Sequence, residues 1–247
     1  MDLGLQGKRA VVAASSAGLG LGTAEALLAE GAQVVINGRD PDRLAATVAR
    51  LPGAIPIAGD VGTSDGARAF VEAAMTELGG IDVLVTNGGG PPPGTYESTP
   101  FEAYPPALEL SLLSVVAMCS AAVPSMRAQG WGRIVAITSV SVRQPIPNLI
   151  LSNTARAGVT GFLKTLAREI AGDGVTVNSV QPGTHDTDRI RSVFGTDLTA
   201  LGADIPAGRV GDAASFGKVA AFLCSEAAWF VTGAAVPVDG GSYAGLQ

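Results

Sequence analysis

Two hydroxyl residues and one arginine are the first side chains whose types and spacing could do chemistry together. Ser139 follows the apolar run 134–137, which is typical of a buried strand. Ser152 and Arg156 come about a dozen residues later, where a long amphipathic segment begins. Side chains four apart on a helix share a face, so Ser152 and Arg156 should point the same way. A strand end and a helix start would then jointly form a reaction site.

A glycine-rich segment, Gly18-Leu-Gly20-Leu-Gly22, is the second candidate for chemistry. Glycines after a first strand let the backbone approach a pyrophosphate, which then lies on the following helix N-terminus. Such a turn alone is a weak signal, because many strand-to-helix turns need glycine. Here a strand precedes it, a helix follows it, and a second strand comes about fifteen residues later, which favours a dinucleotide site.

Strand-like and helix-like segments alternate along the whole chain. Strands are expected at 9–14, 33–37, 54–58, 81–86, 134–137, 175–180 and 234–238. Helices are expected at 23–30, 41–51, 64–78 with Ser64 as N-cap, about 101–127, about 150–170 and 213–223, with an irregular stretch at 181–209. This pattern predicts an α/β, doubly wound Rossmann fold in which a parallel sheet of about seven strands carries helices on both faces.

The length of 247 residues fits one dinucleotide-binding and catalytic domain, 1–247. Ligands of such sheets bind beyond the carboxyl ends of the strands. The loop over 184–207 is too long to be only a connector, and we expect it to be a substrate loop or lid.

Composition restricts the classes of partner. The net charge is −6 and no basic cluster occurs, so we expect neither nucleic acid nor a membrane surface as partner. The apolar segment 110–123 is short for a membrane span, and no signal peptide is visible. Cys119 and Cys224 lie in apolar helical stretches. We therefore expect both to be buried free thiols in a reducing compartment. A cytoplasmic protein without a metal site is expected.

Several short motifs, spread along essentially the whole chain, resemble those of one protein family. They are Ala13-Ala14-Ser15-Ser16-Ala17-Gly18-Leu19-Gly20, Asp60-Val61, Thr86-Asn87-Gly88-Gly89, Asn178 with Pro182-Gly183 and Thr187, Arg209-Val210-Gly211, and Val238-Asp239-Gly240-Gly241. In these positions the chain resembles the short-chain dehydrogenase/reductase family, and within it the 3-oxoacyl carrier-protein reductases.

The resemblance implies a dinucleotide cofactor held by one set of residues. They are Ala14, Ser15, Ser16, Gly18, Leu19, Gly20, Arg39, Asp60, Val61, Asn87, Gly88, Gly89, Arg156, Pro182, Gly183, His185 and Thr187. Ala14 replaces the first glycine of the family pattern, at a position that we expect not to need a left-handed backbone. Arg39 follows the second strand, where an acidic residue would favour NAD(H). A guanidinium suits a 2′-phosphate, so NADP(H) is favoured over NAD(H), the alternative being a solvated turn arginine.

The reaction site departs from the family pattern. The family uses a Ser, a Tyr and a Lys, with an Asn in the proton relay. Ser139 matches the Ser, but Ser152 stands at the Tyr, Arg156 at the Lys, and Ser111 near the Asn. An aliphatic hydroxyl is far less acidic than a phenol and is several ångströms shorter, and arginine does not release its proton. The usual tyrosine route is therefore excluded unless another residue supplies the proton.

Other side chains could supply that proton or bind the substrate. His185, the only histidine, is either a general acid beside the nicotinamide or a surface loop residue. Tyr96, Tyr104 and Tyr243 could each approach the cleft. Arg143 would bind an acidic group or be solvated.

Two functions stay open at this point. The first is an oxidoreductase acting on a small carbonyl or hydroxy compound, with an acidic substrate as one option and a non-redox reaction as another. The second is a non-catalytic member of the fold that binds a dinucleotide or a partner. The resemblance implies a homodimer or homotetramer formed through the long helices and last strand. The small residues Ser114, Ala117, Ala121 and Ala122 would then allow close helix packing, or else belong to the core.

Overall fold

The computed structural model describes residues 2–246 and contains one parallel seven-stranded sheet with the order β3-β2-β1-β4-β5-β6-β7. The strands are β1 Arg9–Val12, β2 Gln33–Gly38, β3 Ala54–Ala58, β4 Val83–Thr86, β5 Gly132–Ile137, β6 Val175–Pro182 and β7 Ala235–Val238. The strand order reverses between β1 and β4. The predicted doubly wound α/β fold is confirmed.

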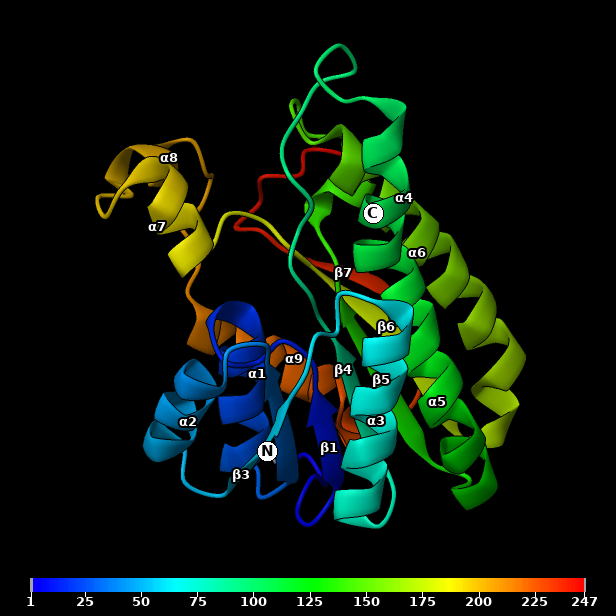
Figure 1. Cartoon of the computed structure of the whole chain (residues 1–247). Coiled ribbons are helices and arrows are strands. Elements are labelled where there is room, and N and C mark those ends of the chain that lie inside the picture. The colour runs from blue at the N-terminus through cyan, green and yellow to red at the C-terminus, as the bar shows by residue number, and fades with distance from the viewer. Residues whose placement is uncertain (1, 247) are drawn as a thin grey trace.

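Helices cover both faces of this sheet (Figure 1). The longer ones are α1 Gly18–Ala29, α2 Pro41–Arg50, α3 Ser64–Leu78, α5 Ser114–Gln129, α6 Ile150–Ile170 and α9 Ala213–Leu223. The short ones are η1 Phe101–Ala103, α4 Tyr104–Leu108, η2 Glu109–Leu113, η3 Val140–Val142, η4 Ala171–Asp173, α7 Asp188–Phe194, α8 Thr199–Ala203 and η5 Glu226–Ala228.

The alternation of side chains along the strands produces two separate apolar cores. Val11 of β1 faces the core formed with α3, α5 and α6, where Phe70 and Met118 are buried. Its neighbours on β1 face the opposite core, formed with α1 and α9, where Leu27 and Phe216 are buried. Burial on both faces explains why the strands are nearly continuous runs of Val, Ile, Leu and Ala.

Three local expectations were wrong. The first helix begins at Gly18 rather than Thr23, so the glycine-rich segment lies within its first turns and not before it. The N-cap of α3 is Thr63, whose hydroxyl accepts a hydrogen bond from the Gly66 amide at 3.1 Å, and not Ser64. The stretch 181–209 is not irregular throughout, since it contains the end of β6 and the short helices α7 and α8.

The long helix predicted at 101–127 is one continuous run of turns that differ in type. Its first turns are 3-10 and α-helical, η2 is a π-helix, and α5 completes it. Pro105 and Pro106 lie in the first turn of α4, where proline is tolerated. Within the described residues this run, Phe101–Gln129, is long and apolar enough to cross a membrane by length and composition alone, a test that core helices of soluble proteins also pass.

The small residues of α5 belong mainly to the core of the chain itself. Ser114, Ala117 and Ala122 are buried, which supports the core interpretation over a close-packing outer surface. Cys119 of the same helix is a buried free thiol, as is Cys224. Burial raises the pKa of both thiols to about 12, so neither is a nucleophile at neutral pH.

Candidate active site

A cleft of about 1010 Å³ lies at the carboxyl edge of the sheet, where the strand order reverses. Most of the predicted site residues line it. They are Ala14, Ser16, Gly18, Leu19, Arg39, Asp60, Val61, Asn87, Gly88, Gly89, Ser139, Ser152, Arg156, Pro182, Gly183, His185 and Thr187. Ser15, Gly20 and Ser111 do not line it.

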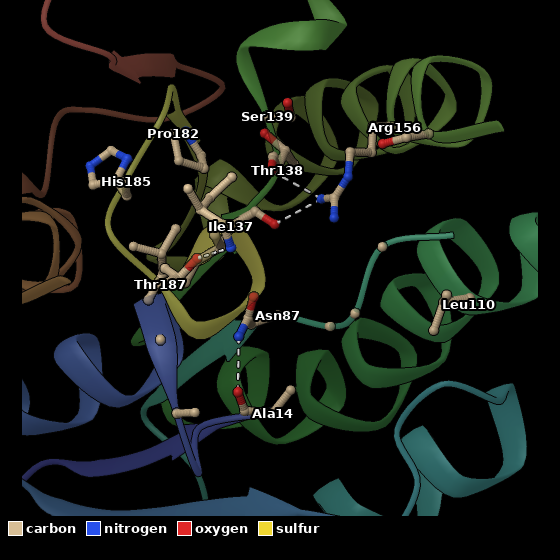
Figure 2. Close-up of a pocket in the computed structure, with 18 of the residues that line it drawn as sticks. Ala14, Asn87, Leu110, Ile137, Thr138, Ser139, Arg156, Pro182, His185 and Thr187 are labelled. Atoms are coloured by element: carbon tan, nitrogen blue, oxygen red, sulfur yellow. Dashed lines mark hydrogen bonds between the residues drawn. The ribbon is translucent and has the colours of Figure 1, made fainter. Parts of the chain in front are cut away.

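Ala14 adopts a conformation that the sequence interpretation did not expect. Its φ is 45°, in the left-handed region that favours glycine, so the expectation for this position was wrong. Two asparagines hold the residue in place from both sides. The Ala14 amide donates to Asn37 Oδ1 at 3.2 Å, and Asn87 Nδ2 donates to the Ala14 carbonyl at 3.0 Å (Figure 2). These bonds stabilise a strained alanine at the start of the phosphate loop.

Ser15 and Gly20 act behind the cleft surface. The Ser15 hydroxyl donates to the Val12 carbonyl at 2.7 Å and accepts from the Asn37 amide at 2.9 Å, in a fully buried position. A Cβ on Gly20 would lie 2.6 Å from Asn87 Nδ2, so only glycine leaves room for the Asn87 bond to Ala14. Both residues therefore shape the loop from beneath.

The N-terminus of α1 has the features that a pyrophosphate needs. Its N-cap, Ala17, provides no side-chain hydrogen bond, and the first turn has no acidic residue. Gly18 and Leu19 of this turn line the cleft. The unpaired backbone amides of a helix start attract anions. The residues present therefore fit the phosphates of a dinucleotide.

Two arginines lie at the end of the cleft next to β2. The Arg39 side chain is 77% exposed, and its Nη1 lies 4.0 Å from Asp60 Oδ2. Arg43 also lines the cleft, and its guanidinium pairs with Asp188 of α7. The sequence interpretation missed Arg43. Its position in the first turn of α2, after the N-cap Asp40, is the signal that could have identified it.

The reaction end of the cleft is formed by β5 and α6, as the opening residues indicated. Ser139 follows β5 by two residues in an extended conformation, and its hydroxyl accepts from the Ser141 amide at 3.1 Å. The Nη1 of Arg156 donates to the carbonyls of Ile137 at 3.2 Å and Thr138 at 3.0 Å (Figure 2). Arg156 thus ties α6 to the strand end that carries Ser139. Ser152, one turn before it, is half-buried and also faces the cleft.

His185 is buried, with 5% of its surface exposed, so the surface-loop alternative was wrong. Its Nδ1 lies 3.2 Å from the Gly183 carbonyl, and its ring packs edge-on against Phe216 with 5.2 Å between centroids. Burial lowers the pKa of His185, against smaller opposing effects of Gly183, Asp212 and Asp239. Figure 2 shows His185 and Arg156 on opposite sides of Ser139.

The π-helical turn decides which residue of the long helix reaches the cleft. Leu110 lines the cleft, whereas the neighbouring Ser111 is buried and its hydroxyl has no partner within the described residues. A π-turn inserts an extra residue and shifts the register of the helix. The sequence interpretation missed Leu110 because a regular α-helix was assumed.

Arg143 is bonded within the chain, and the three tyrosines differ in their distance from the cleft. Arg143 is neither solvated nor aimed at a substrate, because its Nε donates to Gln181 Oε1 at 2.7 Å and its Nη2 to the Ala235 carbonyl at 2.6 Å. Of the tyrosines, Tyr243 lines the cleft. Tyr96 is 83% exposed, and Tyr104 is not part of the cleft lining.

Comparison with known proteins places this site in a family. A family model described as enoyl-(acyl carrier protein) reductase matches residues 13–243. The chain belongs to the short-chain dehydrogenase/reductase family, and its relatives are oxidoreductases.

Two curated relatives and one solved structure illustrate the similarity. The 3-oxoacyl-[acyl-carrier-protein] reductases FabG of Vibrio cholerae and Escherichia coli K12 are each 33% identical to this chain, over 98% of its length and 99% of theirs. The L-sorbose reductase of Gluconobacter frateurii, solved as a complex with NADPH and L-sorbose, has a TM-score of 0.93 and is 33% identical, with 100% of both chains covered.

Proposed function

We propose that this chain is an NADP(H)-dependent oxidoreductase that acts on a small carbonyl or hydroxy compound without the tyrosine proton donor of its family. One observation carries the proposal. The cleft combines an uncapped α1 N-terminus, two arginines beside β2, and the Ser139–Arg156 region at one edge of the sheet. The complex of the related L-sorbose reductase with NADPH supports the choice of cofactor.

Each residue of the reaction end has a proposed role. A bound nicotinamide would supply or accept the hydride. Ser139 binds the substrate oxygen, and Arg156 stabilises negative charge on that oxygen while it holds the end of β5. Ser152 is too short to replace a phenol directly, so a water held by its hydroxyl transfers the proton. His185, whose lowered pKa leaves its imidazole neutral at pH 7, is the alternative group and would accept the proton as a general base when a hydroxy compound is oxidised.

The substrate class follows from charge at this end of the cleft. Arg143 is committed to Gln181 and Ala235, so it does not contribute to substrate binding. Arg156 is then the residue proposed to bind an acidic group on the substrate. We also propose that 1–247 is one domain and that 184–207 is a lid, since Thr187, Asp188 and Ile190 of this segment line the cleft.

Turnover tests the enzymatic proposal. Purified protein is mixed with NADPH or NADP⁺ and panels of ketones and hydroxy acids, and absorbance of the nicotinamide is followed. Turnover is expected with at least one acidic compound. Arg156→Ala should lower kcat/KM by about 100-fold or more, the usual effect of removing one group that stabilises a developing oxyanion. Arg168→Ala, a matched change on an exposed arginine of the same helix, should leave turnover unchanged.

A second candidate function is favoured by the replaced residues themselves. Ser152, Arg156 and the strained Ala14 all depart from the family pattern. A non-catalytic protein that binds the dinucleotide would show tight NADPH binding without turnover on any panel.

The proposed setting is a soluble, cytoplasmic homodimer or homotetramer, as the resemblance to the short-chain dehydrogenase/reductase family implies. Large exposed apolar side chains near β7 support an assembly, since Trp229 is 67% and Phe230 85% exposed. Light scattering should give a mass of two or four chains. A mass of one chain at micromolar concentration would contradict this part of the proposal.

A further inference from the structure

One ion pair crosses the cleft at its β2 end. Arg43 lies in the first turn of α2, and Asp188 is the first residue of α7, 145 positions later in the chain. Both residues line the cleft, and the Arg43 guanidinium donates to the Asp188 carboxylate. Figure 1 shows α7 standing over α1 and α2, so the pair joins the segment 184–207 to the body of the fold.

The charges at this end of the cleft are balanced within the chain. Arg39 lies beside Asp60, and Arg43 is paired with Asp188. A 2′-phosphate would bring nearly two negative charges to the same place. It would compete with Asp188 for Arg43 and would be repelled by the displaced carboxylate. A ribose 2′-hydroxyl, as in NAD(H), would do neither.

The position of Asp188 is fixed by contacts other than its pair with Arg43. Thr187, the N-cap of α7, accepts from the Ile190 amide at 3.4 Å. The Thr187 methyl group lies 3.7 Å from where a Cβ on Gly18 would stand, so α7 begins directly against the α1 N-terminus. Asp186, the residue before Thr187, accepts two hydrogen bonds of 2.6 Å from the Arg191 guanidinium. Asp188 therefore stays near Arg43 when the pair is broken.

We propose that Asp188 is a selectivity residue that occupies Arg43 in place of the cofactor 2′-phosphate and so weakens the preference for NADP(H) over NAD(H). The inference rests on the proposed cofactor function and deepens it. Binding of the 2′-phosphate to Arg43 also breaks the link between α2 and α7, whereas NAD(H) binding leaves that link intact.

Fluorescence titrations of NADPH and NADH test this with no need for a substrate. Asp188→Asn keeps the shape of the side chain and removes its charge. It should tighten NADPH binding by about two- to five-fold, the size expected for one exposed ion pair, and change NADH binding by less. The gain should shrink in 0.5 M salt because the interaction is exposed. Asp204→Asn removes the same charge from the same segment outside the cleft and should leave both affinities unchanged.

The double variant identifies the partner. Arg43→Gln should weaken NADPH binding and spare NADH. Adding Asp188→Asn to Arg43→Gln should tighten NADPH binding less than Asp188→Asn does in the unaltered protein, because only the repulsion by the carboxylate is then removed. An unchanged NADPH affinity in Asp188→Asn, an equal change for both cofactors, or an undiminished gain in the Arg43→Gln background would each overturn the inference while leaving the proposed function standing. No binding of either dinucleotide by the unaltered protein would contradict the proposed function and this inference with it. Thermal unfolding of each variant verifies that the fold is retained.

Discussion

At Ala14 the chain stores backbone strain that a glycine would not have. A left-handed alanine is about 1 kcal/mol or more less stable than a relaxed one, and part of this is offset by the greater flexibility of an unfolded glycine. Ala14→Gly should therefore raise the free energy of unfolding by about 1 kcal/mol and Tm by about 2–4 °C. Urea unfolding measures the change. Ala17→Gly, at an extended φ of −164°, should give no gain, and equal effects of the two variants would contradict the strain argument.

His185 makes stability depend on pH in a defined window. Burial lowers its pKa from an ordinary 6.5, so between the two values the unfolded chain binds a proton that the folded chain excludes. Stability is then complete above about pH 7 and falls by up to about 1.4 kcal/mol per pH unit as the pH drops below 6.5. Because the chain has one histidine, His185→Gln should flatten this part of the profile. Urea unfolding between pH 5 and 7.5 measures the free energy of unfolding of both proteins. If it falls equally steeply with pH in both, His185 is not the cause.

Sequence reasoning located most cleft residues because their motifs are local. Ser139 ends an apolar strand, and Ser152 and Arg156 share a helical face, so chain order alone placed them. It could not find the partners of Arg143 or the burial of His185, since both depend on contacts with distant segments. It also missed Arg43, because the search for a cofactor contact considered only the residue that directly follows β2, which is Arg39.

At the scale of elements, α1 and α9 cross in close contact next to the phosphate loop. A Cβ on Gly217 would lie 2.0 Å from the Gly22 carbonyl oxygen. Gly217→Ala should separate the two helices, destabilise the protein by about 1–3 kcal/mol, and weaken dinucleotide binding through the shifted α1 N-terminus. Gly161→Ala in α6 has open space around its Cβ and should instead stabilise by about 0.5–1 kcal/mol. Thermal unfolding of the two variants measures both changes in stability. A change of the same sign in Gly217→Ala and Gly161→Ala would contradict this prediction.

Element boundaries were predictable where the pattern was complete. β3, α3 and α9 begin and end where the sequence indicated, because apolar periodicity and flanking turn residues agree there. The π-turn η2 and the short helices α7 and α8 were not predictable. A five-residue helix has too few apolar positions to show a period, and a π-turn has the same composition as an α-helix.

At the scale of the whole molecule, the sheet order brings the phosphate loop, the arginines beside β2 and the Ser139–Arg156 region to one edge. The sequence predicted this convergence because alternating strands and helices allow essentially one right-handed arrangement. The reaction could not be predicted in the same way. The fold places residues 139, 152 and 156 together whatever side chains they carry, so it does not determine their chemistry.

Titration of the unaltered protein with NADPH and with NADH tests the central claim most directly, because the cofactor cleft supports every proposed role. Enhancement of the nicotinamide fluorescence should saturate with NADPH, with Kd in the micromolar range or below, and NADPH should bind more tightly than NADH. Arg39→Gln should reduce that difference, because Arg39 lies at the end of β2. Saturable binding of neither dinucleotide would contradict the account.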